Sequence, residues 1–114
     1  MAIYANLNID QGSDFFSVVS VEGSNGLPYD LTGHTAAGVV RRNYTSTTSY
    51  PFVVTINNPV RGDIEIAMDN TVTSTMKPGR YVYDIEITET VTSDKTRVIE
   101  GQVEIAPGVT SNGN

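Results

Sequence analysis

The chain has 114 residues, which is the size of a single domain. It contains no cysteine and one histidine, which excludes disulfide scaffolds, thiol nucleophiles and multi-histidine metal sites. Seven basic and thirteen acidic residues give a formal net charge of −6, which argues against nucleic-acid binding. No apolar run approaches the roughly 18 residues that cross a bilayer, and the first ten residues do not resemble a signal peptide. We therefore expect a soluble protein made in the cytosol, with no nucleic-acid or membrane partner.

Valine and isoleucine far outnumber leucine, and threonine is abundant. Such β-branched side chains fit a pleated strand and lose rotamer freedom in a helix, so we expect a β protein. Residues 3–10 alternate between apolar and polar, which predicts a strand with one face toward a core. Residues 15–22 begin with apolar side chains on both faces, which predicts a central strand or one covered on both sides.

The middle of the chain contains two predicted strands separated by turns. Residues 23–26 end in Asn-Gly, which predicts a tight turn, and residues 27–33 are expected to form a loop across one end of the domain. Residues 35–42 and 52–56 are expected to be the next strands. Between them, the polar Thr/Ser stretch at residues 44–50 is expected to be a long turn or an exposed edge.

The second half of the chain shows the clearest alternation. Residues 63–68 predict a strand whose even-numbered residues face the core, and residues 81–88 predict one whose odd-numbered residues do so. Residues 70–76 have two apolar side chains four positions apart, which predicts one helical turn. The Pro-Gly pair at residues 78–79 is expected to end that turn.

The last predicted strand covers residues 98–105, with the odd-numbered residues inward and Val98 outward. About seven strands without a long helix favour an all-β fold, an antiparallel Ig-like β-sandwich, with jelly rolls and small barrels left open. The cysteine pair and core tryptophan of immunoglobulin domains are absent, so this prediction rests on strand count. We expect one domain over residues 1–114, with short flexible ends at about residues 1–3 and 108–114.

Acidic side chains are the first candidates for chemistry. Three groupings have the oxygen ligands that calcium prefers: Asp10 with Asp14, Asp63 with Glu65, and Asp84 with Glu86 and Glu89. We interpret them as the solvent-facing side of alternating strands, because no aspartate-rich loop with a glycine pivot accompanies them. Their neighbours are Thr, Asn and Ala, which give no apolar pocket to keep one carboxyl protonated for glycoside hydrolysis.

The single histidine, His34, has no Gly-x-Ser-x-Gly element to pair with and is expected at the surface or in a loop. The sequence therefore predicts a non-enzymatic protein with no catalytic residue, no metal and no cofactor.

Four residues are candidates for an interaction surface. Tyr44 and Tyr50 bracket the polar stretch and are expected to be exposed, where tyrosine suits a carbohydrate or a protein neighbour. Arg41 and Arg42 are candidates to pair with acidic patches on another copy or another subunit. The predicted interaction surface therefore consists of Tyr44, Tyr50, Arg41 and Arg42.

Five motifs follow one another in an order that is familiar from a known family. They are Asp10-Gln11-Gly12 with Phe15-Phe16; the run Asn25-Gly26-Leu27-Pro28-Tyr29-Asp30-Leu31-Thr32-Gly33-His34-Thr35-Ala36; Arg41-Arg42; Pro78-Gly79-Arg80-Tyr81-Val82-Tyr83-Asp84-Ile85; and residues 97–103 with Pro107-Gly108-Val109-Thr110. In this order they resemble small β domains of tailed-bacteriophage virions, including the N-terminal adaptor domains of baseplate upper proteins and short cyanophage virion proteins. His34 departs from the family, which usually has an aromatic residue there, often tyrosine.

The resemblance implies a structural role in a virion, with several copies docking on a larger scaffold through an edge strand or through the ends at residues 1–6 and 109–114. A baseplate, tail or neck component is the first prediction, and a capsid decoration protein is the close alternative. A carbohydrate-binding module that uses Tyr44 and Tyr50 is the third hypothesis. The expected partners are other virion structural proteins, with a homo-oligomer left open, in a particle assembled from protein made in the host cytoplasm.

Overall fold

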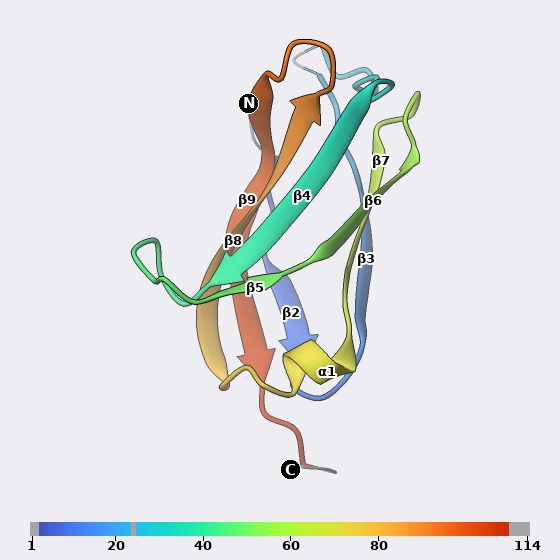
Figure 1. Ribbon diagram of the computed structural model, residues 1–114. Helices are drawn as coiled ribbons and strands as arrows, with labels where there is room; N and C mark the ends of the chain where they lie inside the picture. Colours follow the sequence, from blue (N-terminus) through green and yellow to red (C-terminus); the bar gives the residue numbers. More distant parts are fainter. Residues whose placement is uncertain (1–2, 24, 110–114) are drawn as a thin grey trace.

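The computed structural model describes residues 3–23 and 25–109, which form two β-sheets packed face to face (Figure 1). The larger sheet consists, in spatial order, of β1 (Ile3–Tyr4) with β2 (Leu7–Asp10), β9 (Lys95–Ala106), β8 (Gly79–Glu89), β4 (His34–Arg41) and β5 (Ser49–Pro51). The smaller sheet consists of β3 (Phe15–Ser20), β7 (Asp63–Met68) and β6 (Val53–Asn58). The predicted all-β sandwich is confirmed.

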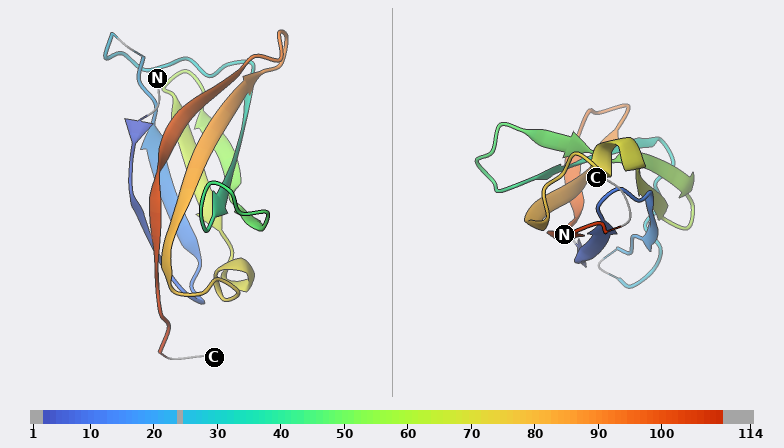
Figure 2. Two further views of the ribbon diagram at one scale, coloured as in Figure 1. Left: turned by 90° about the vertical axis from the view of Figure 1, so that its left-hand side faces the viewer. Right: turned by 90° about the horizontal axis from the view of Figure 1, so that it is seen from below.

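Most neighbouring strands are antiparallel, but β1 and β2 both run parallel to β9. The first and last described residues consequently lie at opposite ends of the sandwich (Figure 2). The pairing of Ile3 with Ile99 places residue 3 in β1, so the expectation that residues 3–6 belong to a free end is wrong. At the other predicted flexible end, the backbone nitrogen of Gly108 donates a hydrogen bond to the Gln11 side chain at 3.2 Å and Val109 is exposed, whereas residues 1–2 and 110–114 lie outside the described residues.

The first predicted strand is divided into β1 and β2 because its backbone makes a close contact with β9. A Cβ at Gly101 would lie 2.1 Å from the carbonyl oxygen of Ala5, so glycine is what permits this approach. The Tyr83 hydroxyl donates a hydrogen bond to the same carbonyl oxygen at 2.7 Å. The side-chain oxygen of Asn6 accepts a hydrogen bond from the backbone nitrogen of Gln102 at 3.0 Å. These contacts replace the regular ladder at the break.

The core lies between the sheets, and the predicted register of β8 is confirmed. Its odd-numbered residues from Tyr81 to Ile87 are buried. In β9 the prediction for Val98 is wrong, because this side chain is buried at 3% exposure. Ile85 pairs with Ile99 while Glu86 pairs with Arg97, so a β-bulge leaves Val98 without a partner and turns it inward.

A short helix, α1 (Asn70–Thr73), connects the smaller sheet to the larger one. The predicted helical turn over residues 70–76 is therefore present but shorter. Asp69 caps it, because its carboxylate accepts a hydrogen bond from the backbone nitrogen of Thr71. The described residues contain no helix with the length and apolar character of a membrane span.

Tyr81 forms a recognisable feature of immunoglobulin-type sandwiches just after this connection. Its hydroxyl donates a 2.7 Å hydrogen bond to the backbone carbonyl of Lys77, four residues upstream. A tyrosine at the start of such a strand that bonds back to the preceding turn is the tyrosine corner. The Ig-like character of the fold therefore rests on a structural marker as well as on strand count.

Candidate interaction surface

The outer face of the smaller sheet carries an apolar row. Phe16 of β3 pairs with Ala67 of β7, and Ala67 pairs in turn with Val53 of β6. Directly opposed residues point to the same face of an antiparallel sheet, so these three side chains lie side by side. They face away from the core, because the adjacent Ile66 is fully buried. Phe16 and Val53 are 63% and 64% exposed.

Val18 extends the row along β3 and is 49% exposed. We refer to Phe16, Val18, Val53 and Ala67 together as the apolar outer patch. Beyond Val18 the face becomes polar, since Ser20 donates a 2.7 Å hydrogen bond to the Asp63 carboxylate. An exposed apolar patch bounded by polar residues is typical of a surface that contacts another molecule.

The position of β3 explains how the patch arises. The sequence predicted a central strand or one covered on both faces, and this prediction is wrong, because β3 pairs only with β7 and forms an edge of the smaller sheet. Its inward side chains contribute to the core, whereas no described element of the chain covers its outward face. The apolar residues on one face of β3 therefore pack in the core, and those on the other face remain accessible at the surface.

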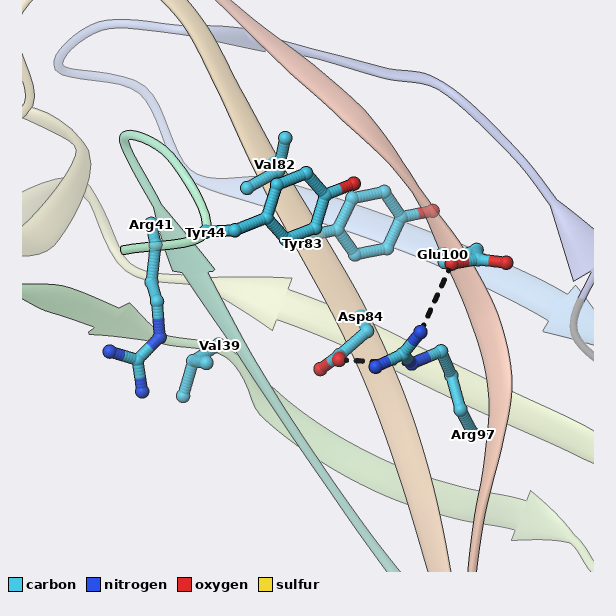
Figure 3. A pocket seen from close by; sticks show the side chains of 8 residues that line it. All are labelled: Val39, Arg41, Tyr44, Val82, Tyr83, Asp84, Arg97 and Glu100. Atoms are coloured by element: carbon cyan, nitrogen blue, oxygen red, sulfur yellow. Dashed lines mark hydrogen bonds and ion pairs between the residues drawn. The ribbon is translucent and has the colours of Figure 1, made fainter. Parts of the chain in front are cut away.

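Two of the four predicted surface residues, Arg41 and Tyr44, line a shallow depression of about 320 Å³ on the outer face of the larger sheet (Figure 3). Tyr44 is 82% exposed, as expected from the sequence. Arg41 is held in place, because its guanidinium donates a 2.9 Å hydrogen bond to the backbone carbonyl of Ser46.

Charged side chains on the floor of this depression pair with one another. The Arg97 guanidinium lies 3.2 Å from the Asp84 carboxylate and 3.3 Å from that of Glu100, between the two acidic groups (Figure 3). Arg80 and Glu104 form a further ion pair at 3.7 Å on the same face. These charges are stable in water without a partner molecule.

The other two predicted residues lie at a different place. Arg42 and Tyr50 line a second depression with Tyr81. The Tyr50 ring packs edge-on against the Tyr81 ring, with the centroids 6.1 Å apart, and is half-buried. The Arg42 guanidinium lies 4.8 Å from the Tyr81 ring centroid, within cation–π range. The predicted four-residue surface is therefore two separate sites, and Tyr44 and Tyr50 do not form one platform.

The acidic candidates mostly have structural partners. Asp14 accepts hydrogen bonds from the backbone nitrogen and the side-chain nitrogen of Asn70, at 2.7 and 2.9 Å, and so holds the start of α1. Asp63 contacts Ser20 and lies 3.8 Å from the Arg61 guanidinium. In the described ranges 3–23 and 25–109, no three His, Asp or Glu side chains come together as a metal site would require.

His34 and Tyr83 are the remaining groups with chemical potential. His34 is half-buried at the start of β4, with its ring edge-on to Tyr29 and its Nδ1 3.2 Å from the Thr32 carbonyl oxygen. Burial raises the pKa of Tyr83 to about 12, and nearby Tyr4 adds to this shift. At neutral pH the Tyr83 phenol is therefore a hydrogen-bond donor that fixes the Ala5 backbone.

Comparison with known proteins identifies no family and no activity for the chain. No protein-family model and no curated protein sequence matches the chain. Among solved structures, InlP of Listeria monocytogenes is similar at 16% identity with a TM-score of 0.49, covering 92% of this chain and 28% of that one. A family 123 glycoside hydrolase of Clostridium perfringens, described in terms of glycolipid glycan hydrolysis, is similar at 15% identity with a TM-score of 0.43, covering 95% and 23%.

This chain thus spans less than a third of the length of either protein. At these identities neither protein bears on what the chain does. The resemblance to phage β domains stays a prediction.

Proposed function

We propose that this chain is a non-enzymatic structural component of a tailed-bacteriophage virion, in the baseplate, tail or neck, that docks on a larger scaffold through its smaller sheet. The observation that carries the docking surface is the apolar outer patch. The virion setting is supported by the order of the five motifs over residues 10–110.

The apolar outer patch suits a permanent neighbour for two physical reasons. Each square ångström of apolar surface removed from water contributes about 25 cal/mol, and the exposed parts of Phe16 and Val53 are largely apolar. The patch also lies on paired strands, so little conformational entropy is lost when a partner covers it. A charged rim that includes Asp63 and Glu65 favours one orientation of the partner over others.

The virion role is tested by quantitative mass spectrometry of purified particles of a phage that encodes this chain. The proposal expects the chain in fixed stoichiometry with tail, baseplate or neck proteins, at tens of copies or fewer. Hundreds of copies per particle support the capsid decoration alternative instead. Particles that lack the chain altogether contradict both structural roles.

The docking surface is tested by complementing a deletion phage with variants. Val53→Ser removes an outward apolar side chain that is 64% exposed, and we expect reduced incorporation into particles. Val60→Ser is the matched control, because Val60 is 66% exposed but lies in the turn between β6 and β7 rather than on the sheet. Equal incorporation of the two variants would place the docking surface elsewhere.

Carbohydrate binding is a second candidate, which Tyr44 favours. Its exposed ring lies beside a depression that contains the Asp84 and Glu100 carboxylates, groups able to accept hydrogen bonds from sugar hydroxyls. A glycan array of host surface polysaccharides tests this hypothesis. Saturable binding that Tyr44→Ala abolishes supports a glycan-binding role, and the absence of binding to any glycan in the array removes it.

A further inference from the structure

The four edges of the two described sheets differ in how well they are protected against pairing with another strand. In the larger sheet, β5 is three residues long and ends in Pro51, and the opposite edge is interrupted between β1 and β2. In the smaller sheet, a register shift between Ile56 and Asn58 interrupts β6. Short strands, proline and bulges are the usual devices that protect an exposed edge.

The edge of β3 has none of these devices. It has six residues, no charged side chain and no proline, and it pairs with β7 without a register shift. No described strand pairs with its other side. An uninterrupted, uncharged edge is a ready template for a further strand.

The hydrogen-bond pattern shows which groups of β3 are available. The backbone nitrogen of Val21 bonds to the carbonyl oxygen of Gly62 on the β7 side, at 2.8 Å. Because residues alternate along an antiparallel strand, Val19, Ser17 and Phe15 also direct their N–H and C=O groups toward β7. The N–H and C=O groups of Phe16, Val18 and Ser20 therefore point to the open edge.

We propose that β3 of a second copy of this chain pairs with that edge, antiparallel and around a two-fold axis at Ser17. In this register Phe16 of each copy lies opposite Val18 of the other, and these are the residues whose backbone groups point outward. Ser17 lies opposite Ser17 of the second copy in a non-hydrogen-bonded pair. A two-fold contact requires a surface that matches itself, and β3 is nearly symmetric in apolar character about Ser17.

Charge and apolar contact select this register over its neighbours. An axis at Val18 would place Asp14 opposite Glu22 of the second copy, and like charges directly opposite each other are unfavourable. An axis at Phe16 would place Asp14 opposite Val18. The axis at Ser17 places Asp14 opposite Ser20, and it joins the outward Phe16 and Val18 of both copies into one cluster.

The pairing would join two smaller sheets into one continuous sheet of six strands. Edge pairing lies in the plane of the sheet, so the outer face with Val53 and Ala67 stays accessible to a scaffold. The inference goes beyond the proposed function and does not depend on it, because it concerns the purified chain alone. The experiments can therefore show a homodimer without a virion role, or a virion role without a homodimer.

The first test uses native mass spectrometry and one engineered cysteine in this cysteine-free chain. We expect the wild-type mass to double from 12.3 kDa as concentration rises. Ser17→Cys should then give a disulfide-linked dimer on mild oxidation, because opposed residues of a non-hydrogen-bonded pair have Cα atoms about 4.5 Å apart. Val54→Cys is the matched control, since Val54 lies in the same row at the opposite edge of the sheet. We expect little cross-linking of this variant.

Three results would overturn the proposal. They are a monomer at every concentration, equal cross-linking of Ser17→Cys and Val54→Cys, and a cross-link formed by Val18→Cys in place of Ser17→Cys. The last of these would show that the axis lies at Val18.

A second variant blocks the edge without touching the core. Val18→Pro removes an N–H that points away from β7, and edge strands tolerate proline at such positions. We expect a folded monomer by circular dichroism and native mass spectrometry. If Val18→Pro fails to fold, Val18→Lys keeps the N–H and adds a charge to the apolar cluster, and we expect a weaker dimer. A Val18→Lys dimer as stable as the wild type would contradict the proposal.

Discussion

The outer faces of the two sheets arise from the same alternation of inward and outward residues, but one face is charged and the other is apolar. On the larger sheet, Arg97 lies between Asp84 and Glu100, and Arg80 pairs with Glu104. On the smaller sheet, Phe16 and Val53 are well exposed across an apolar row. Paired charges are well solvated without a neighbour, whereas covering an apolar row removes apolar surface from water and lowers the free energy. The proposed docking through the smaller sheet rests on this difference.

The largest expected effect separates the core from the charged face within a single strand. Ile85 is fully buried, so Ile85→Ala should lower the free energy of unfolding by about 2–5 kcal/mol. Its neighbour Glu86 is exposed on the outer face, and Glu86→Ala should change stability by less than about 0.5 kcal/mol. Chemical denaturation measures both values. Similar costs would show that the outer face of the larger sheet contributes more to folding than its paired charges indicate.

The next prediction concerns the buried phenol that holds the start of the larger sheet. The pKa of Tyr83 is raised to about 12, above the value near 10 that tyrosine has in an unfolded chain. The folded state therefore holds this proton more tightly. The stabilisation is complete below about pH 10 and is lost as the pH rises toward 12.

Thermal unfolding between pH 8 and 12 should thus show a decline that is weaker in Tyr83→Phe, whose baseline stability is also lower because the bond to Ala5 is lost. Parallel pH profiles for the two proteins would mean that Tyr83 is ionised as easily as in solvent.

The tyrosine corner should contribute a smaller amount to stability. Tyr81→Phe removes the 2.7 Å hydrogen bond to the Lys77 carbonyl and should cost about 1 kcal/mol. Tyr44→Phe is the control, because the Tyr44 side chain is 82% exposed and should be nearly neutral. Urea denaturation of both variants gives the comparison, and a neutral Tyr81→Phe would remove the corner as a stabilising element.

The smallest effects distinguish the two outer faces directly. Arg97→Ala and Phe16→Ser should each cost less than about 1 kcal/mol, since both side chains are largely solvent-exposed. The cost of Arg97→Ala should decrease as salt is added, because salt screens exposed ion pairs. The cost of Phe16→Ser should not decrease with salt. The same salt dependence for both variants would erase the chemical contrast between the faces.

The sequence predicted the elements whose environment is local. Alternation in residues 63–68 and 81–88 identified the inward side chains of β7 and β8 correctly, because each strand has one buried and one wet face. The prediction for Val98 was wrong because its burial results from a β-bulge between β8 and β9, and such a bulge depends on the partner strand. The tyrosine corner had a usable signal, since Tyr81 follows a Pro-Gly turn at the start of a strand.

The candidate interaction surface was harder to predict than the fold. The four predicted residues are close in sequence, but the fold divides them between two depressions. One depression is lined by Arg41 and Tyr44, and the other by Arg42 and Tyr50. The apolar outer patch comes from three strands, and only their register brings Phe16 next to Val53. The pattern of residues 15–22 correctly indicated a strand with two apolar faces. What covers each face depends on the order of the strands in the sheet, which the pattern does not contain.

The most direct measurement compares hydroxyl-radical labelling of the free chain with labelling of the chain in intact particles. Phe16 reports on the smaller sheet and Tyr44 on the larger one, and both aromatic rings are well exposed in the described structure. We expect Phe16 to lose most of its labelling on assembly while Tyr44 keeps its own. Unchanged labelling of Phe16 together with protection of Tyr44 would contradict docking through the smaller sheet.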